Sequence, residues 1–305
     1  MIPSSSPVNP ETRLVLFTPV RDEEQYIGAM MQSILAQTIR PARWIIVDDG
    51  SIDSTCEIIA RYQQGHDFIE LLRLPRRDRR RPGGEGAIDC ALHGLCLEDF
   101  DFVARFDADL CFESNYIAGI LGEFEKDPSL GIAGGGLFVE KDGTLQPEKA
   151  PAYHVRGALK MYRRECFEQI GRLATCMGWD TIDEVSAWTK GWATKSFFQY
   201  RVIHRRPTRE GLPTRRIYWK RGEGEYFTWS DPLFVMAKAF KIARDSRGVT
   251  APLSFLAGFA ACYFSRPGRL RHAVFVVARR KQQRARMAAA EKKLLLRLFQ
   301  IPLRS

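Results

Sequence analysis

The chain has 305 residues, enough for one large α/β domain with an appendage or for two domains, and its hydrophobic fraction of 45% is ordinary for a globular protein. The formal net charge is +10, but residues 266–305 hold twelve Lys and Arg and one acid, a net of +11, which leaves −1 for the other 265 residues. This distribution argues against a nucleic-acid-binding core and for a tail that meets an anionic surface.

The cysteines and the apolar segments bear on the compartment. Seven Cys are scattered along the chain without a C-x-x-C pair, which is typical of reduced thiols in the cytoplasm. The N-terminus has no charged-then-apolar pattern of a signal peptide. The longest apolar stretch, residues 249–264, has 16 residues, whereas a membrane-spanning helix needs roughly 20. We therefore expect a cytoplasmic protein.

Strand and helix patterns alternate four times in the first half of the chain. The β-rich runs are 13–20, 43–51, 68–74 and 101–109. Between and after them, apolar residues at helical spacing predict helices, with Asp22 and Ser114 as expected N-caps of the first and fourth helix. Such alternation predicts an α/β fold in which helices cover both faces of a mostly parallel sheet.

Polar segments follow each of these four runs. They read "TPVRDEE", "DDGS", the arginine- and glycine-rich "RRDRRRPGGEGA", and "DAD". Because ligands of parallel sheets bind beyond the carboxyl ends of the strands, these segments should meet at one edge. Acids at this edge can bind the base, the ribose and a metal ion, and arginines together with glycine backbone N–H groups can bind phosphate. The pattern therefore predicts a binding site for a nucleotide diphosphate.

The second half has a different pattern. We expect a glycine-rich strand at 131–140, an irregular segment at 151–173 that leads into a short helix, and an acidic helix start in "GWDTIDEVSAWTKGW". A strand ending in His204 follows, then a polar loop over 208–226 and a helical, basic C-terminal region.

Three ordered motifs resemble the family-2 glycosyltransferases with a GT-A fold. The opening "FTPVRDEEQYIGAMMQSILAQTIRPARWIIVDDGSIDST" looks like the start of that family, "RFDADL" stands where it keeps a D-x-D metal motif, and "GWDTIDE" stands where it keeps the acidic segment with the catalytic base. The resemblance covers about residues 13–205. It implies a GT-A catalytic domain at 1–205, with a nucleotide-sugar half near 13–110 and an acceptor half at 111–205, and leaves 206–305 as a flexible loop and helical extension.

The same resemblance implies an inverting, metal-dependent transfer of a sugar from a UDP-sugar. Two carboxylates one residue apart, Asp107 and Asp109, project the same way if they end a strand, which suits Mn²⁺ or Mg²⁺. The alternative is a solvated strand end. By resemblance Asp109 is the more direct ligand, Asp107 supports ribose or metal, and His204 completes the metal site unless it is an ordinary surface histidine.

Nucleotide contacts are expected from the first loops. Asp48 and Asp49 can accept hydrogen bonds from uracil and ribose, although Asp-Gly-Ser is also good turn chemistry, with Ser51 or Asp53 as a helix cap. The resemblance places further nucleotide contacts in the first loop, at Pro19, Arg21 and Glu23. The charge of the arginine loop suits capture of the diphosphate by one or two of Arg79, Arg80 and Arg81, of which Arg81 is selected; the alternative is a solvated loop.

The catalytic base is expected in "WDTIDE". A carboxylate within hydrogen-bond reach of the acceptor hydroxyl removes its proton, and Asp180, Asp183 and Glu184 all compete for this role. Thr181 with Glu184 forms a capping-box pattern, and Asp180 can act as an N-cap. Elimination of these two favours Asp183.

The sequence therefore favours a hexosyl- or related transferase that passes a sugar to a polysaccharide or lipid-linked acceptor, with the polar loop around Trp219–Tyr226 ordering over the donor. Cations mixed with Leu and Phe at helical spacing predict that the C-terminal helix contacts an anionic membrane, or else packs against the catalytic domain. The rival hypothesis is a non-enzymatic membrane-surface or nucleic-acid-binding protein acting through the tail. For the transferase we expect no nucleic acid partner.

Overall fold

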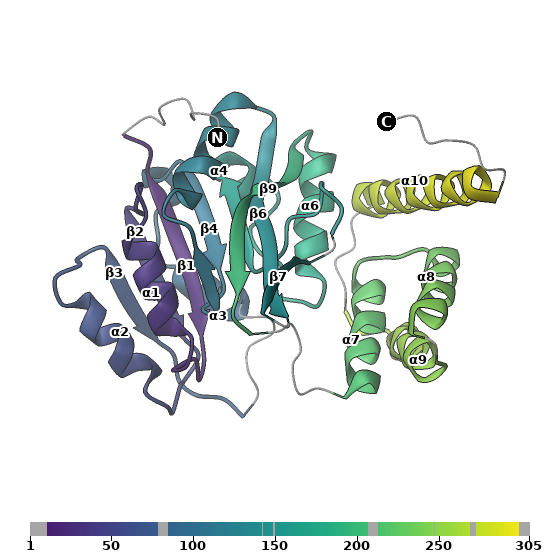
Figure 1. Ribbon diagram of the computed structural model, residues 1–305, viewed down its shortest axis with the longest axis horizontal. Coiled ribbons are helices and arrows are strands. Elements are labelled where there is room, and N and C mark those ends of the chain that lie inside the picture. Colours follow the sequence, from purple (N-terminus) through teal and green to yellow (C-terminus); the bar gives the residue numbers. More distant parts are fainter. Residues whose placement is uncertain are drawn as a thin grey trace. The chain divides into compact units, whose positions relative to one another are not determined.

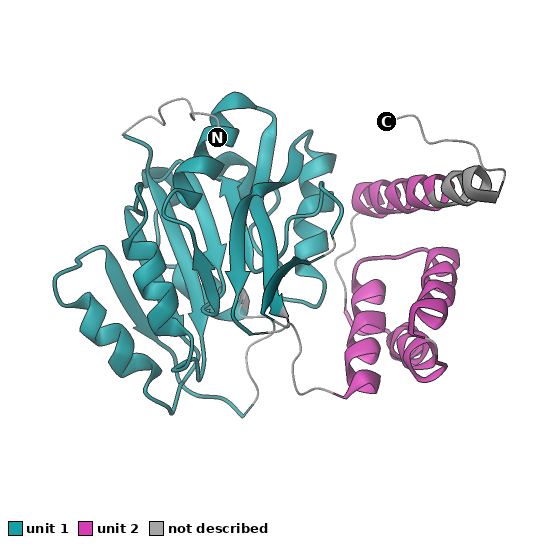
Figure 2. Cartoon of the chain, viewed as in Figure 1, with its two compact units in different colours: residues 1–208 teal, residues 209–305 magenta. Residues whose placement is uncertain are grey.

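The computed structural model describes residues 11–78, 85–141, 143–148, 150–206, 213–246, 248–268 and 273–298. The chain forms two compact units, Met1–Thr208 and Arg209–Ser305 (Figures 1 and 2), and the boundary expected from the sequence lies three residues earlier. In the described part of the chain no helix is long and apolar enough to cross a membrane.

Unit 1 is built around one mixed sheet. Its strands are β1 (Leu14–Val20), β2 (Arg43–Asp48), β3 (Ile69–Arg73), β4 (Phe102–Phe106), β5 (Leu110–Phe112), β6 (Leu130–Lys141), β7 (Thr144–Pro147), β8 (Leu159–Arg163) and β9 (Ala193–His204). The order is β3-β2-β1-β4-β8-β6-β9-β5, with β7 paired to β6. The four predicted strands β1 to β4 run parallel, as the alternating pattern required.

Helices cover both faces of this sheet. They are α1 (Ile27–Leu35), α2 (Thr55–Gln63), α3 (Glu85–Leu92), α4 (Tyr116–Lys126), α5 (Arg164–Gln169) and α6 (Trp179–Thr189). Alternate residues of β1 face opposite sides, so Leu14 and Leu16 join the core under α1, α2 and α4, whereas Val15 and Phe17 join the core under α3, α5 and α6. β1 is therefore apolar on both of its faces, because both faces are buried.

Three strands, β5, β7 and β8, were not predicted from the sequence. The segment expected to be irregular contains β8, which pairs antiparallel with both β4 and β6. Its residues Lys160, Tyr162 and Arg163 are polar or amphipathic, and Lys160 is fully buried. The strand forms because β4 and β6 supply backbone hydrogen-bond partners and because the buried Asp183 forms an ion pair with Lys160.

The predicted helix caps are wrong. Neither Asp22 nor Ser114 caps a helix, and α1 and α4 begin at Ile27 and Tyr116 without a side-chain cap from the preceding residue. Instead Gln37, from the segment after α1, accepts a hydrogen bond from the Ile117 N–H at 3.0 Å and donates to the Glu113 carbonyl at 2.7 Å. A distant side chain satisfies the open N-terminus of α4.

Unit 2 is helical, as expected, but starts differently. It contains α7 (Thr214–Phe227), α8 (Pro232–Ser246), α9 (Thr250–Ser265) and α10 (Ala273–Leu298). The polar loop predicted around Trp219–Tyr226 is therefore wrong, since these residues lie in α7. Glycines of α7 and α9 allow these two helices to pack closely: a Cβ on Gly222 would lie 2.8 Å from the Phe259 nitrogen, and one on Gly258 would lie 2.9 Å from the Trp219 carbonyl carbon.

A buried polar cluster joins three helices of unit 2. Glu225 of α7 forms ion pairs with Lys238 of α8 and, at 3.7 Å, with Arg279 of α10. Gln283 of α10 donates to the Ser230 hydroxyl at 2.7 Å. Burial opposes ionisation, but the two cations hold the pKa of Glu225 below its usual value.

Candidate active site

The carboxyl ends of β1, β2 and β4 lie at one edge of the sheet. β1 pairs in parallel with both neighbours, and in its register with β2 Val20 lies opposite Asp48. The Asp49 N–H donates to the Val20 carbonyl at 2.9 Å, which ties the first two loops together. The segments expected to bind a nucleotide are thus neighbours in space.

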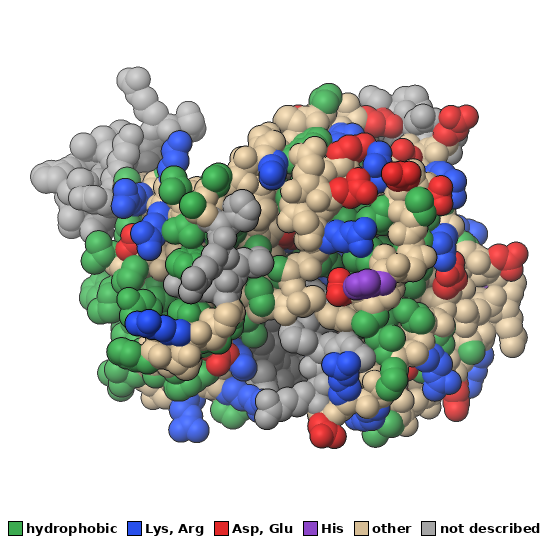
Figure 3. All heavy atoms as spheres, turned by 180° about the vertical axis from the view of Figure 1, so that it is seen from behind, with side chains coloured by type: hydrophobic (Ala, Val, Ile, Leu, Met, Phe, Trp, Pro, Cys, Tyr) green, Lys and Arg blue, Asp and Glu red, His purple; other side chains and the backbone are tan. Residues whose placement is uncertain are grey.

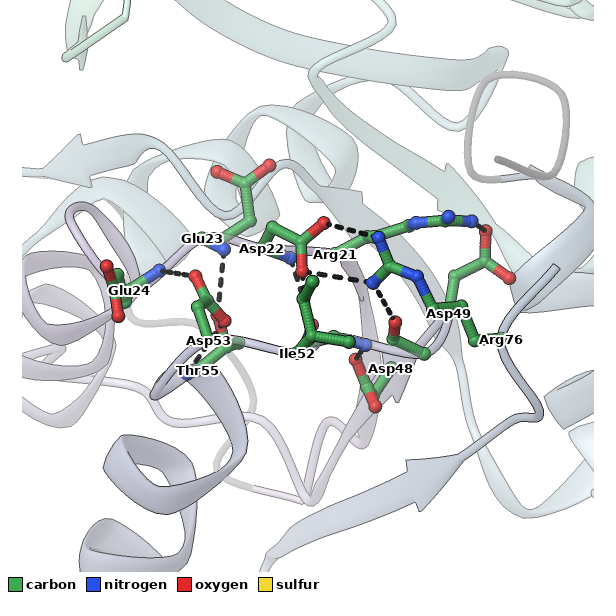
Figure 4. Close-up of polar contacts among 12 residues, drawn as sticks. Arg21, Asp22, Glu23, Glu24, Asp48, Asp49, Ile52, Asp53, Thr55 and Arg76 are labelled. Atoms are coloured by element: carbon green, nitrogen blue, oxygen red, sulfur yellow. Dashed lines mark hydrogen bonds and ion pairs between the residues drawn. The ribbon is translucent and has the colours of Figure 1, made fainter. Parts of the chain in front are cut away.

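These two loops interlock through backbone hydrogen bonds (Figure 4). The N–H groups of Asp22 and Glu23 donate to the hydroxyls of Ser51 and Thr55 at 2.9 and 2.7 Å, and the Ile52 N–H donates to the Asp22 carboxylate at 2.9 Å. Asp22 adopts a left-handed backbone with φ of 55°. Asp22 is held by the second loop and therefore cannot cap α1.

A buried ion pair joins the same loops. The Arg21 guanidinium lies 3.5 Å from the Asp49 carboxylate and also donates to the Arg77 carbonyl at 2.8 Å. Asp48 accepts from the Ser51 N–H at 2.9 Å, which is the turn role considered for it. Pro19 lies within β1, opposite Val47, and contributes its ring to the strand end.

Asp107 and Asp109 occupy the turn between β4 and β5. β4 ends at Phe106, so the period-two argument for the two side chains does not apply. Asp107 faces back to Arg105 at 2.9 Å, and desolvation together with the Asp109 charge raises the pKa of Asp107. Asp109 is buried and turns the other way, toward residues from the end of β9.

The end of β9 reaches Asp109 because β5 pairs with β9. Leu110 lies opposite His204, and the Arg205 N–H donates to the Asp109 carbonyl at 2.8 Å. His204 Nε2 then lies 3.4 Å from Asp109 Oδ1. The structure therefore brings Asp109 and His204 together, as the resemblance implied.

Arg206 was not among the residues selected from the sequence. Its guanidinium lies 2.9 Å from both Glu23 Oε1 and Asp109 Oδ2, so it bridges the first loop and the turn after β4. Burial opposes ionisation of Asp109, but the hydrogen bonds and charges of His204 and Arg206 lower its pKa. The carboxylate is thus balanced by two protein cations.

Glu148 orients His204 from the opposite side. Its carboxylate lies 3.6 Å from His204 Nδ1 and is also paired with Arg156. Although desolvation works against protonation, Asp109 and Glu148 raise the pKa of His204 to about 9. With Nδ1 turned to a carboxylate, Nε2 is the nitrogen presented toward Asp109, which is the arrangement that metal-binding histidines use.

The donor set can be compared with the needs of a divalent cation. Among the described residues no group of three or more His, Cys, Asp and Glu side chains is placed to hold a metal. Two donors do converge: Asp109 Oδ1, of a buried carboxylate, lies 3.4 Å from His204 Nε2. Mg²⁺ is commonly held by one or two protein ligands together with substrate phosphates, so this pair fits a metal–diphosphate complex.

The acids of α6 lie in different environments. Asp183 is buried and accepts hydrogen bonds from Lys160 Nζ at 2.7 and 2.9 Å and from the Tyr162 hydroxyl at 2.6 Å. Desolvation and the Glu184 charge, opposed by Lys160, raise the pKa of Asp183 to about 6. Glu184, also buried, accepts from the Val155 N–H at 2.7 Å. Its predicted capping box with Thr181 is therefore wrong.

Asp180 is the half-buried acid of the three. It lies in the first turn of α6, which begins at Trp179, so it is not the N-cap. Arg105 connects this turn to the other acids: its guanidinium lies 2.9 Å from Asp107, donates to the Gly157 carbonyl at 2.6 Å and lies 4.8 Å from the centre of the Trp179 ring. Arg105 thus links the turn after β4 with the start of α6.

The acids of the candidate site were predicted without most of the cations that contact them in the structure. Arg79, Arg80 and Arg81 lie outside the described residues. The residues it missed are Arg105, Glu148, Lys160 and Arg206. Only Arg105 and Lys160 left a signal, as cations inside otherwise apolar strand-like runs, and burial of a charge requires a partner.

Comparison with known proteins identifies the family. The sequence profile of glycosyl transferase family 2 matches residues 15–178, more than half of the chain. Poly-β-1,6-N-acetyl-D-glucosamine synthases are similar over a shorter range: the protein of Staphylococcus aureus strain COL is 26% identical over 124 residues, and that of Staphylococcus epidermidis is 25% identical over 125. These alignments cover 41% of this chain and only 28% of the length of those relatives.

Solved structures share the fold at low sequence identity. A mannosyltransferase, PcManGT, from Pyrobaculum calidifontis in complex with GDP-Man and Mn²⁺ has a TM-score of 0.54 at 16% identity, covering 95% of this chain and 83% of that one. S. aureus TarS 1–349 in complex with UDP-GlcNAc has a TM-score of 0.52 at 15% identity, covering 83% and 73%. The expected GT-A fold with a helical C-terminal region is confirmed. The protein is a glycosyltransferase, and the chain belongs to glycosyl transferase family 2.

Proposed function

We propose that this enzyme is an inverting, metal-dependent glycosyltransferase that moves a sugar from a UDP-sugar to a polysaccharide or lipid-linked acceptor. The observation that carries this proposal is the convergence of Asp48, Asp49, Asp109 and His204 at one edge of the sheet, with the α6 acids joined to that edge through Arg105. Binding of UDP-GlcNAc by TarS and the polysaccharide products named for the similar synthases support donor and acceptor class.

The first two loops would hold the nucleoside. Asp48 and Asp49 are buried, and hydrogen bonds between the first two loops hold their backbone in place. The carboxylates that would accept hydrogen bonds from the base and the ribose are therefore positioned before binding. Arg21 neutralises part of this negative charge. Glu23 would face the ligand once Arg206 moves, since Arg206 now occupies its carboxylate.

Asp109 and His204 would hold Mn²⁺ or Mg²⁺ together with the donor diphosphate. When bound, such a cation offsets negative charge that develops on the leaving diphosphate. Arg206 pairs with the other oxygen, Asp109 Oδ2, and therefore competes with a cation for the charge of this carboxylate. A guanidinium displaced by the cation would be available to the diphosphate, which Arg binds well. Asp107 would stay with Arg105 and support the ribose or the cation from the side.

We assign the role of base to Asp180 in place of Asp183. Asp183 and Glu184 are enclosed by Lys160, Tyr162 and the Val155 N–H, and an acceptor hydroxyl would have to displace these partners to reach them. Asp180 lies one turn earlier and is half-buried. It lies next to Gly157, since a Cβ placed on Gly157 would be 3.3 Å from the Cβ of Asp180. Its carboxylate can take the proton of the attacking hydroxyl while Asp183 and Lys160 hold the helix start in place.

The test combines donor binding with turnover. UDP-sugars and GDP-mannose are titrated with Mn²⁺ by calorimetry, and slow hydrolysis of the accepted donor gives a rate without a known acceptor. Asp109→Asn should abolish Mn²⁺-dependent donor binding. Asp180→Asn should keep donor binding and lower transfer to an added acceptor about 10²- to 10⁴-fold. Unchanged metal-dependent binding in Asp109→Asn would refute the metal assignment, and full transfer by Asp180→Asn would refute the base.

We also propose that the enzyme works at the cytoplasmic face of a membrane, where a lipid-linked acceptor would be found. Unit 2, residues 209–305, carries 21 Lys and Arg against six acids, a net of +15, so unit 1 carries 10 − 15 = −5. A strongly basic unit in the same chain as an acidic catalytic unit favours an anionic surface as its partner.

A further inference from the structure

The helices of unit 2 expose large apolar side chains. Fourteen such side chains are exposed in the described part of the chain, and ten of them belong to unit 2. Among them are Phe264 at 81%, Phe240 at 75%, Leu233 at 73% and Leu253 at 62% exposed. Figure 3 shows hydrophobic side chains gathered with Lys and Arg over this part of the molecule. Single exposed apolar residues are ordinary, but a group of this size calls for a partner.

On α8 these side chains form one face. Leu233, Met236 and Phe240 recur at the three- and four-residue spacing that places side chains on the same side of a helix. The opposite side holds Val235 and Ala239, which pack against Phe255 in the core of unit 2. α8 is therefore also apolar on the side that faces away from the core of unit 2.

α9 repeats the arrangement. Between Thr250 and Ser265 it contains no charged residue. Phe255 and Gly258 face α7 and the core, whereas Leu253, Ala257 and Phe264 lie along an exposed stripe at helical spacing. With 16 residues at about 1.5 Å each the helix is about 24 Å long, short of the roughly 30 Å hydrocarbon core. Its length suits a position along a bilayer surface.

The charges next to this face are mainly basic. The exposed face of α8 continues from Phe240 to Lys241 and Arg244, and Arg244 lies 3.2 Å from the exposed carboxylate of Asp245. The described part of α10 exposes Lys281 and Arg284. Lys238 is not part of this set because it is paired with the buried Glu225. Apolar side chains bordered by cations match the headgroup–acyl boundary of an anionic bilayer.

We propose that the exposed faces of α8 and α9 form a membrane-binding surface. Leu233, Phe240, Leu253 and Phe264 enter the boundary between headgroups and acyl chains of an anionic bilayer, while Lys241 and Arg244 meet lipid phosphates. This deepens the proposed membrane location by assigning it to α8 and α9, where the sequence had pointed to the basic C-terminal helix. A second copy fits less well, because each copy brings a unit of net +15 and the two would repel. Nucleic acid would meet the cations and could stack on the aromatic rings, but it would leave the exposed aliphatic side chains Leu233 and Leu253 without an apolar partner.

The experiment measures binding of the full chain to vesicles. Sedimentation with vesicles of phosphatidylcholine alone, and with about 30% phosphatidylglycerol, is compared at low and high salt. Wild-type protein should bind the anionic vesicles. Phe240→Ser/Phe264→Ser should lower the partition coefficient at least tenfold at both salt concentrations. Lys241→Gln/Arg244→Gln should weaken binding at low salt and flatten its salt dependence.

Matched control variants show whether the loss of binding belongs to this surface. Phe198→Ser changes an exposed aromatic residue of unit 1 and should leave binding unchanged. Lys281→Gln/Arg284→Gln removes the same charge from α10 and should weaken binding less than the change on α8. Donor hydrolysis should be the same in Phe240→Ser/Phe264→Ser and wild type, so loss of the proposed catalytic function would appear separately.

Three outcomes would overturn the proposal. The first is absence of vesicle binding by the wild type, which would mean that another part of the chain covers the face. The second is equal binding by the Phe240→Ser/Phe264→Ser variant and the wild type. The third is a concentration-dependent dimer that this variant abolishes, which would make a second copy the occupant.

Discussion

Replacement of Lys160 by Met should destabilise unit 1 by about 3–5 kcal/mol. The ammonium group is fully buried and donates to both oxygens of Asp183 at 2.7 and 2.9 Å and to the Asp180 carbonyl at 2.6 Å. Met has similar length but no donor. The variant would leave Asp183 and Glu184 side by side in the interior without the cation that compensates them.

The magnitude follows from what remains after the change. The pKa of Asp183 is already raised to about 6 with Lys160 present, and Lys160 is the largest influence that opposes desolvation. Without it the pKa should rise further, so that the carboxyl group is protonated at neutral pH. Each pH unit between about 3.9, the ordinary carboxyl pKa in an unfolded chain, and pH 7 costs about 1.4 kcal/mol; the wild type already bears about two of these three units, so the change adds about 1.4 kcal/mol. Loss of the hydrogen bonds to the Asp180 carbonyl and to Glu184 adds about 2–3 kcal/mol.

Urea denaturation followed by tryptophan fluorescence measures the effect, since Trp179 lies against the lysine at 5.4 Å. The folded-state pKa of Asp183 lies above its unfolded value, so the variant should lose stability as pH rises from about 4 through that raised pKa, and the deficit should shrink at about pH 5. Arg43→Met is the control: its ion pair with Glu70 is short, 2.6 Å, but both side chains are exposed. It should cost at most about 1 kcal/mol. Equal losses in the two variants would refute the argument from burial.

Three further changes test the packing and the site. Gly258→Ala should destabilise unit 2 by about 2 kcal/mol or more, because the new Cβ would clash with the Trp219 backbone. Calorimetric melting measures this loss, and an unchanged melting temperature would contradict the close packing of α7 against α9. Gln37→Ala should cost about 1–3 kcal/mol in urea denaturation, since buried backbone groups lose their partners, and a loss near zero would mean that water replaces them. Arg206→Ala should raise the affinity for Mn²⁺ in the absence of donor by about tenfold, since one competing cation leaves Asp109; lower affinity in calorimetry would show that Arg206 supports the site instead.

Local sequence was sufficient for the elements whose cause is local. β1, β2 and β4 are continuous apolar runs because they are buried on both faces, and this pattern can be read without the fold. The polar residues that follow them could be placed at one edge from the parallel arrangement alone. The family motifs added Asp109 and His204, which the structure brings to 3.4 Å.

Elements fixed by distant partners could not be predicted in this way. β8 contains the buried Lys160, whose acid lies 23 residues later on α6. The α4 N-terminus is satisfied by Gln37, 80 residues earlier. α7 was predicted as a loop because its sequence is polar, whereas Gly222 provides room for α9. In each case the partner that decides the local structure lies far away along the chain, so the neighbouring sequence does not identify it.

The bridge from Arg206 to Glu23 joins residues 183 positions apart. Contacts of such separation form late, because most of the intervening chain must fold before its ends can meet. A growing chain in which β9 has not yet been synthesised contains the two loops after β1 and β2 but lacks both His204 and Arg206. Capture of the metal–diphosphate complex would thus be reserved for completely folded unit 1, and a partly synthesised chain would not consume nucleotide-sugar.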